Sequence, residues 1–331
     1  IWRSARSEAV VELDLRSAKP VGSVRVDWGT NGFASDVAVE ISTNGLDWRP
    51  AGRIRARAGD FGVAMNEEVG LARQVRLSFS GGPAEGFEVA GLTLRGTEGA
   101  ARPWALYELA AAHAPEGVYP DAFRGRRNHW TVAAGAKPGD PEALLDEWGV
   151  FAPEARRPTL ATWIATGGQV DTARQATERE HRLGGDGAPM PETVWKMASG
   201  LSLRIRALAR SGTTPATSWV QYELANDSLM AQTGRLCWAV RPVRLPPPRA
   251  GGGFAPIYKI RFAETDSGWR EIWANDEPLF AFPEGGVSFG AAPFNEGDVA
   301  EYFLRGETPE AKSATDENGL ASAAWWLDFA L

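Results

Sequence analysis

The sequence predicts a mostly β protein: a small β domain followed by a larger antiparallel β-sandwich, joined by a short helical linker. Two observations lead to this prediction. Apolar and polar residues alternate with the period of half-buried strands, as in "SVRVDW" and "DVAVEIS". Gly, Pro, Asn and Asp interrupt these runs at short intervals, which favours sandwiches over βαβ units, and 37 Gly and 22 Pro provide many turns.

The first domain is expected at residues 1–96. "IWRSARSEAVVELDL" enters directly into an alternating pattern, and "RQVRLSFSGG" continues that pattern up to a Gly-Gly turn. Asn44 and Gly45 predict a tight hairpin turn, because both residue types tolerate positive φ. Trp48, just after that turn, is expected in the core rather than in contact with a ligand.

Two segments predict helices. "RPWALYELAAAHA" follows the first domain where the composition changes, so a linker containing a short helix is expected at residues 97–117. "NEGDVAEYFLRGETP" offers Asn295 or Asp298 as an N-cap and Gly306 as a stop.

The second domain is expected at residues 118–331. In "GLSLRIRALARSG" the apolar positions alternate with Ser and Arg, and "SWVQYELAN" and "RLCWAVRP" are its expected neighbours. The chain closes on "ASAAWWLDFAL", where Trp325 and Trp326 are consecutive. Consecutive residues of a strand point to opposite faces, so one ring is expected inward and the other outward.

Composition argues against several classes of function. A net charge of -7 and a pI near 5.3 argue against a nucleic-acid binder, which needs clustered Lys and Arg. The single Cys237 excludes a disulfide within the chain and is expected to be a buried thiol. Three His without CxxC or HExxH spacing give no support for a metal, and no cofactor is expected. No apolar run approaches the roughly 20 residues of a membrane span.

The first domain resembles a known family. "EISTNGLDWRPAGRI", with the strands around it, resembles discoidin domains, the coagulation-factor C-type jelly rolls used widely as carbohydrate-binding modules. The resemblance implies a sugar site in loops at one end of the barrel, where the candidates are Asn31, Phe33, Asp60 and Phe61. The alternative for Phe33 and Phe61 is that they cap the core.

The second domain carries a second resemblance. Segments from "YPDAFRGRRNHWTVAAG" to "NEGDVAEYFLRGETP" follow an order similar to the β-sandwich that precedes the (α/α)6 barrel in bacterial six-hairpin glycosidase-like proteins. In that family the catalytic carboxylates lie on the barrel. Nothing in this chain matches the barrel, so a missing C-terminal helical domain or a partner chain is implied.

An Arg-rich and aromatic stretch lies at the start of the second domain. Its residues either pack the sandwich beside a solvated loop, or form an interface or substrate-binding loop, since Arg and Trp serve both roles. "RPVRLPPPRAGGG" is a second candidate surface. The candidate residues are Arg124, Arg126, Arg127, His129, Trp130, Arg241 and Arg244.

Catalysis by this chain alone is not expected. The acidic pairs Asp146–Glu147, Glu264–Asp266 and Asp276–Glu277 lie where turns between strands are predicted, and such pairs are usually solvated. No nucleophile elbow, phosphate loop or dinucleotide fingerprint is present.

Three hypotheses for function follow. The first is a non-catalytic, carbohydrate-binding and domain-supporting region of a glycoside hydrolase-like protein. The second is a stand-alone module that binds glycans or proteins in adhesion. The third is an accessory part of a carbohydrate phosphorylase or of an inactive relative. Ile1 is not an initiator Met, which suggests that residues precede it, and handling of polysaccharide implies the periplasm or the cell exterior.

Overall fold

The computed structural model describes the chain apart from residues 56–60, 97–102, 136, 138–139, 141, 185–189, 211–216, 247–252, 266–267 and 284. The side chains of residues 61–69, Pro103, Leu109, His113, Arg210 and Asn295 are also outside the description. Asp60 and Asp266 therefore lie outside the described residues, and Phe61 is placed through its backbone alone.

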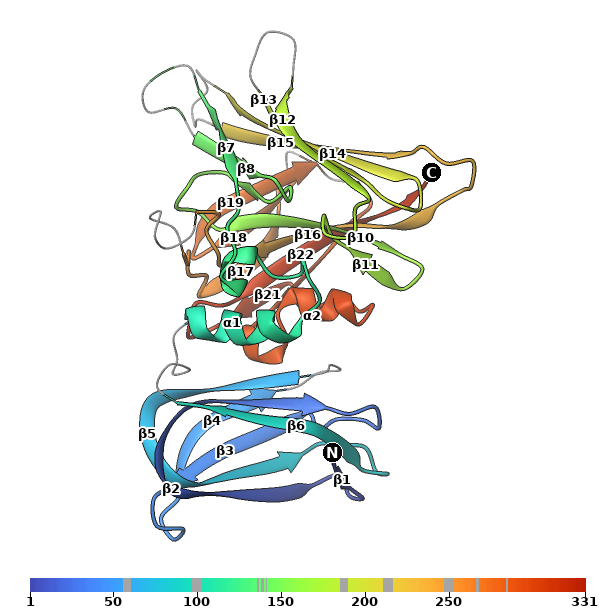
Figure 1. The fold of residues 1–331 in the computed structure, drawn as a ribbon. Helices are drawn as coiled ribbons and strands as arrows, with labels where there is room; N and C mark the ends of the chain where they lie inside the picture. The colour runs from blue at the N-terminus through green and yellow to red at the C-terminus, as the bar shows by residue number, and fades with distance from the viewer. Residues whose placement is uncertain are drawn as a thin grey trace. The chain divides into compact units, whose positions relative to one another are not determined.

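The protein is mostly β, built from antiparallel sheets with few helices, which confirms the predicted fold class (Figure 1). The chain divides into two compact units, residues 1–109 with 293–305, and residues 110–292 with 306–331. The segment 293–305, expected in the second domain, thus groups with the first unit. It does so because η4 (Phe294–Glu296) contacts two strands of that unit, and the Phe294 ring stacks on Tyr107 at 5.1 Å.

The first unit contains a six-stranded sheet of order β1-β6-β2-β5-β3-β4, which curls over its own core (Figure 1). The long strands β2 and β5 change register between Asp14 and Lys19 and again between Val21 and Ser23. Such irregularities bend a strand and increase its twist. Among the described residues the strands are β1 (Trp2–Ser4), β2 (Ala9–Trp28), β3 (Asp36–Ser42), β4 (Arg49–Arg55), β5 (Phe61–Ser80) and β6 (Phe87–Arg95).

The predicted hairpin and both predicted helices are present. Asn44 Oδ1 accepts the N–H groups of Leu46 and Asp47 at 2.9 Å between β3 and β4, and Gly45 has a φ of 77°. Helix α1 (Pro103–His113) lies in the expected linker. In α2 (Val299–Leu304) the Asp298 carboxylate caps the N-terminus by accepting from the N–H of Ala300 at 3.1 Å.

The second unit contains three sheets. The largest has eight strands in the order β20-β22-β16-β10-β9-β8-β7, with β11 paired to β10; the others are β12-β13-β14-β15 and β19-β18-β17-β21. The described elements are η2 (Asp121–Arg124), β7 (Trp130–Ala134), β8 (Glu142–Asp146), β9 (Phe151–Ala152), β10 (Thr159–Thr166), β11 (Gln169–Asp171), β12 (Glu178–Gly184), β13 (Met190–Lys196), β14 (Leu201–Arg210), β15 (Thr217–Asn226), β16 (Thr233–Arg241), β17 (Lys259–Glu264), β18 (Trp269–Ala274), β19 (Glu277–Pro283), β20 (Val287–Ala292), β21 (Ser313–Thr315) and β22 (Ser322–Ala330).

The core of the second unit is rich in aromatic rings. Trp325 stacks on Phe282 at 5.1 Å and on Trp238 at 5.9 Å. Its neighbour Trp326 is also buried, at 8% exposed, but it lies outside the core cluster that holds Trp325. The two rings thus point to opposite faces as expected, and the outward ring is covered. Cys237 is the buried thiol that the sequence predicts, and burial raises its pKa to about 12.

No helix in the described part of the chain combines the length and the apolar character that crossing a membrane requires.

Candidate functional site

Three loops meet at one end of the first unit: residues 5–8, 29–35 and 81–86. Backbone hydrogen bonds join them, from the N–H of Gly82 to Ser7 O at 3.0 Å and from the N–H of Ser35 to Gly81 O at 3.4 Å. The strand register places the backbone of Phe61 opposite Asp27, close to where β2 ends and the loop 29–35 begins. The sequence candidates Asn31, Phe33 and Phe61 therefore belong to this loop end.

A shallow hollow of about 520 Å³ lies at the loop end. Its floor follows from the strand register, which aligns Val10, Ser78 and Ala38 directly across β2, β5 and β3. These three side chains point away from the core, because their neighbours alternate with them. The hollow is lined by Arg6, Glu8, Ala9, Val10, Asp36, Ala38, Ser78, Phe79 and Ser80.

Long charged side chains occupy the next row of the same three strands. Arg76 is paired with Glu12 at 2.8 Å and with Glu40 at 3.7 Å, and its guanidinium lies 3.7 Å from the ring centroid of Trp48. Trp48, expected in the core, is instead half-buried beneath this guanidinium. The hollow thus arises where a row of short side chains lies beside a row of long ones.

Asp36 is an acceptor at the hollow whose orientation is fixed by hydrogen bonds. Both of its oxygens accept from Arg53, Oδ1 from Nε and Oδ2 from Nη2, at 2.6 Å each. The hydrogen bond from Arg53 lowers the pKa of Asp36 below its usual value, against a smaller opposing effect of burial. Asp36 is therefore an ionised acceptor of fixed orientation, and Ser80 Oγ lies 3.5 Å from its Oδ2.

A second polar group lies at the same loop end, around the buried carboxylate of Glu88. Its Oε2 accepts from Arg3 Nε at 2.9 Å and from Asn31 Nδ2 at 2.8 Å, although Glu88 is only 4% exposed. Gly29 makes room for this carboxylate, since a Cβ at that position would lie 2.4 Å from Glu88 Cγ. Asn31 is thus held at the surface by a buried anion.

Phe33, in the same loop as Asn31, packs against the core. Its ring lies 6.3 Å from that of Trp28, and Trp28 in turn contacts Phe79 and Phe87. This is the core-capping arrangement that was weighed as the alternative to a ligand contact. The roles of Asn31, Phe33, Asp60 and Phe61 in binding stay predictions.

In the second unit, much of the Arg-rich stretch is engaged within the chain. Arg124 donates to the carbonyl oxygens of Ala114 and Pro115, and Arg126 pairs with Glu116 at 2.7 Å. The Trp130 ring is half-buried and packs on a small apolar cluster. These contacts are internal.

The remaining candidates differ in accessibility. Arg127 and His129 are exposed, and Arg127 has no hydrogen bond or ion pair with any residue that the structure describes. Arg241 is 1% exposed, donates to Val118 O at 2.6 Å and lies over the Tyr119 ring at 4.3 Å. Arg244 is half-buried. Assignment of these residues to substrate or interface stays a prediction.

One cluster near this stretch had no signal in the sequence. The Trp148 ring is contacted by the guanidiniums of Arg174 at 3.7 Å and Arg179 at 3.6 Å from its centroid. Two guanidiniums at these distances overlap if they share one face, so they cover both faces. Trp148 therefore offers no free ring face to a ligand, and its partners come from distant segments that local patterns do not connect.

The acidic pairs are mostly tied to cations. Glu264 pairs with Arg270, Asp276 with Lys259 and Glu277 with Arg157, at 2.7 to 3.0 Å. Asp146 is buried and accepts from the backbone N–H groups of Trp148 and Val150.

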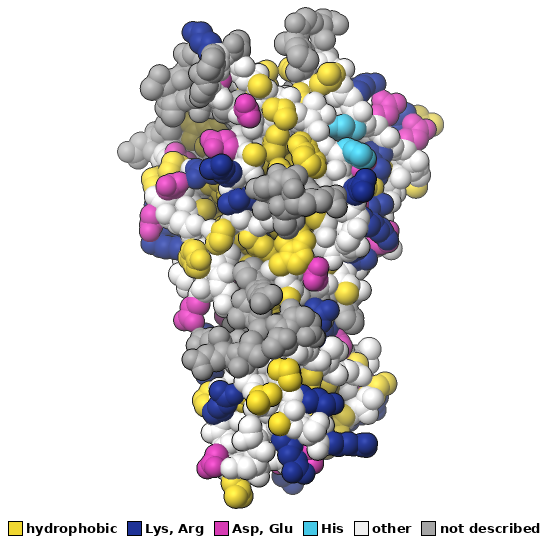
Figure 2. Space-filling view, turned by 60° about the vertical axis from the view of Figure 1, so that its left-hand side comes forward, with side chains coloured by type: hydrophobic (Ala, Val, Ile, Leu, Met, Phe, Trp, Pro, Cys, Tyr) yellow, Lys and Arg dark blue, Asp and Glu magenta, His cyan; other side chains and the backbone are white. Residues whose placement is uncertain are grey.

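Within the described residues no group of three or more His, Cys, Asp and Glu side chains is arranged to hold a metal ion. On the face shown in Figure 2, basic and acidic side chains are interspersed.

Neither a scan against protein-family models nor a search of curated protein sequences finds a match for this chain.

Several solved structures of carbohydrate-binding modules resemble parts of the chain. Chitosan-binding module 1 from a chitosanase/glucanase of Paenibacillus sp. IK-5 is 19% identical, with a TM-score of 0.26, over 29% of this chain and 75% of its own. The module CpGH89CBM32-6 produced by Clostridium perfringens is 16% identical, with a TM-score of 0.24, over 29% and 75%. The CBM32-1 and CBM32-2 domains of Clostridium perfringens ZmpB, in complex with GalNAc, are 9% identical, with a TM-score of 0.28, over 99% and 80%. Matches at this level identify neither a family nor a ligand for this chain.

Proposed function

We propose that this chain is a non-catalytic carbohydrate-binding region and that the hollow at the loop end of the first unit takes the sugar. The hollow itself is the observation that carries the proposal. Its volume of about 520 Å³ lies in the range of small-molecule sites. Its floor of short side chains admits a ring, while Asp36, Ser78 and Ser80 offer hydroxyl-binding groups.

The polar residues of the hollow have complementary roles. A sugar hydroxyl both donates and accepts, so it is best bound by an acceptor and a donor together. Asp36, oriented by Arg53, is the acceptor, and Arg6 at the opposite rim is the donor. Asn31, held by Glu88, and the loop around Phe61 are the proposed contacts for a longer glycan.

The wider context is also a proposal. The order of segments in the second unit supports a glycoside hydrolase-like parent that acts on polysaccharide in the periplasm or outside the cell. The catalytic carboxylates would then lie outside these residues. The coding sequence beyond Leu331 tests this proposal. A run of amphipathic helices of barrel length supports a glycoside hydrolase-like parent protein, and absence of such helices rules that parent protein out.

The binding proposal is tested on the full chain by a glycan array and by affinity electrophoresis in soluble polysaccharides. Ala38→Tyr fills the hollow from β3, where Ala38 is half-exposed. Ala90→Tyr is the matched control, because it makes the same change at an exposed position of β6 outside the hollow. Both substitutions place a good strand former in a strand.

The expected result is binding to at least one glycan that Ala38→Tyr abolishes and Ala90→Tyr retains. Binding that survives Ala38→Tyr but is lost in Asn31→Ala moves the site to the Glu88 group. Absence of binding to every glycan tested overturns the proposed function.

A further inference from the structure

The outer face of the sheet β12-β13-β14-β15 in the second unit carries an exposed aromatic side chain beside fixed polar ones. Leu203, Ile205 and Ala207 point inward and are fully buried, so Arg206 and Leu208, which alternate with them, point outward. The register sets Gln221 opposite Arg206 and Trp219 opposite Leu208. These four outward residues define the Arg206 face.

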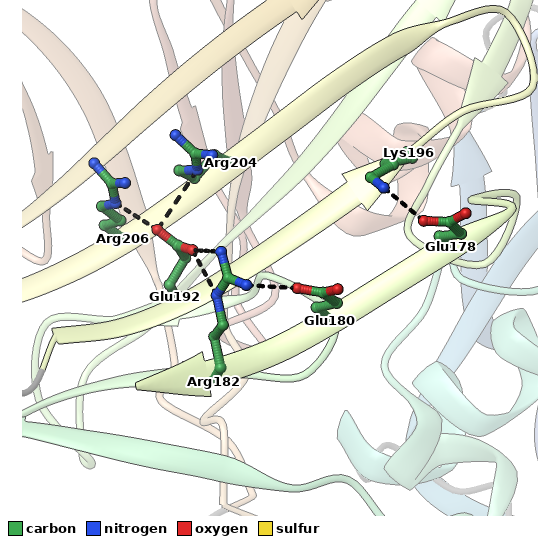
Figure 3. Close-up of polar contacts among 7 residues, drawn as sticks. All are labelled: Glu178, Glu180, Arg182, Glu192, Lys196, Arg204 and Arg206. Carbon is green, nitrogen blue, oxygen red and sulfur yellow. Dashed lines mark hydrogen bonds and ion pairs between the residues drawn. The ribbon is translucent and has the colours of Figure 1, made fainter. Parts of the chain in front are cut away.

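A buried carboxylate organises the polar side of the Arg206 face. The Glu192 side chain is 2% exposed, yet it accepts from Arg182 on Oε1 at 2.8 and 3.0 Å and from Arg206 Nε on Oε2 at 2.5 Å (Figure 3). Burial raises the pKa of Glu192, but the hydrogen bonds from Arg206 and Arg182 outweigh it and leave that pKa below its usual value. Glu192 is therefore an ionised anchor.

The other two guanidiniums of this network, those of Arg182 and Arg204, each pair with a second carboxylate. Arg182 also binds Glu180 at 2.8 Å, and Arg204 binds Glu223 at 3.1 Å. In Arg206 only the Nε is engaged, and the terminal nitrogens point away from Glu192 in Figure 3. They have no hydrogen-bond partner among the residues that the structure describes, and the side chain is 34% exposed. Arg206 thus presents a free, oriented N–H fork.

Trp219 is held in place although 46% exposed. Its Nε1 donates to Thr217 Oγ1 at 3.2 Å, and its ring meets Trp269 edge-on at 6.1 Å. Trp219 is the diagonal neighbour of Arg206 across two strands, a spacing of about 7–8 Å that long side chains bridge. Gln221, also exposed, lies directly opposite Arg206 and two residues from Trp219 along β15.

From this geometry we infer that the Arg206 face is a second saccharide site, specific for an acidic sugar whose ring stacks on Trp219 and whose carboxylate binds the Arg206 fork. A planar carboxylate matches a guanidinium fork in two parallel hydrogen bonds. A uronic acid supplies that carboxylate one bond from a ring that an indole covers. The amide of Gln221 then pairs with a ring hydroxyl.

Charge balance favours this specific ligand over a general polyanion. Arg182, Arg204 and Arg206 are matched by Glu180, Glu192 and Glu223, so the network has no excess positive charge. Attraction of any polyanion needs such an excess. The inference does not rest on the hollow of the first unit, which Ala38→Tyr removes separately.

The test is affinity electrophoresis of the full chain in polygalacturonate, with fully methyl-esterified polygalacturonate, dextran sulfate and poly-L-glutamate as comparison polymers. Trp219→Ala removes the stacking ring, and Arg206→Lys keeps the charge but loses the fork. Arg235→Lys is the control, because Arg235 is half-buried and paired with Asp328 on another sheet.

Binding to polygalacturonate is expected, with a loss of about tenfold or more in Trp219→Ala and in Arg206→Lys. The Arg235→Lys and Ala38→Tyr variants are expected to bind polygalacturonate like the unsubstituted chain. The methyl-esterified polymer is expected to bind far more weakly. Equal binding of the methyl ester, or binding of dextran sulfate or poly-L-glutamate that Trp219→Ala leaves unchanged, overturns the inference. So does absence of polygalacturonate binding.

Discussion

The guanidinium of Arg124 hydrogen-bonds the carbonyl oxygen of Ala114, the residue that follows helix α1. The same group reaches the carbonyl of Pro115 at 3.2 Å. The carbonyls at a helix C-terminus lack partners within the helix and carry the negative end of the helix dipole. An arginine chosen from sequence as a ligand or interface candidate therefore also closes a helix end.

We predict that Arg124→Met lowers the free energy of unfolding by about 1–2 kcal/mol, through the loss of charged hydrogen bonds to two carbonyls. Arg127→Met is the control three residues along, where an exposed side chain without described partners is expected to contribute less than about 0.5 kcal/mol. Urea denaturation of the two variants measures the difference. Equal effects would show that the Arg124 contact contributes nothing.

Gly29 and Glu88 give a second prediction. A Cβ at position 29 would lie 2.4 to 2.5 Å from three atoms of the Glu88 side chain, so Gly29→Ala is expected to destabilise the first unit by about 1–3 kcal/mol. Combination with Glu88→Ala removes the clashing atoms and should cancel most of that cost. A double-mutant cycle by chemical denaturation measures the coupling, and strict additivity would contradict the proposed clash.

Asp146 predicts a pH dependence of stability. Burial raises its pKa from the usual 3.8 to about 7, although backbone N–H groups of Val150 and Trp148 oppose the shift. Between these two pKa values the folded chain binds more protons than the unfolded chain, so stability falls as pH rises from about 4 to about 7. The difference of about three pH units corresponds to a loss on the order of 4 kcal/mol.

Asp146→Asn should flatten this slope, because the amide oxygen still accepts the two backbone N–H groups and does not titrate. Denaturation curves from pH 4 to pH 8 provide the measurement. Asp227→Asn, at an exposed carboxylate, is the control and should keep the slope of the parent chain. An unchanged slope in Asp146→Asn would show that Asp146 is not its source. His181 cannot account for a fall, because burial lowers its pKa and stability then rises with pH.

Asp36 predicts the pH range of glycan binding. Because Arg53 holds the pKa of Asp36 below its usual value, the carboxylate stays ionised at pH 5 and above, and binding should not change between pH 5 and pH 8. In Arg53→Met the carboxylate loses its orientation, so weaker binding is expected at every pH in this range. Affinity electrophoresis at several pH values tests both statements. A change in glycan binding near neutral pH in the unsubstituted chain would show that Asp36 is not the acceptor that binds the glycan.

Local signals in the sequence were sufficient for much of the fold. Alternation placed the strands, because a strand that buries one face needs an apolar residue at every second position. Asn44 and Gly45 placed a hairpin turn, and Asp298 placed a helix start, because each acts on backbone groups within a few residues. The burial of Cys237 followed from its apolar neighbours.

Only the tertiary structure decided where side chains from distant segments meet. The hollow exists because the register aligns Val10, Ala38 and Ser78 across three strands, and no local pattern specifies that alignment. The burial of Trp326 likewise depends on the covering of the second face of its sheet, which the alternation in β22 does not specify. Sequence patterns report which faces of an element are apolar, whereas contacts between elements depend on strand order and register, which long-range packing sets.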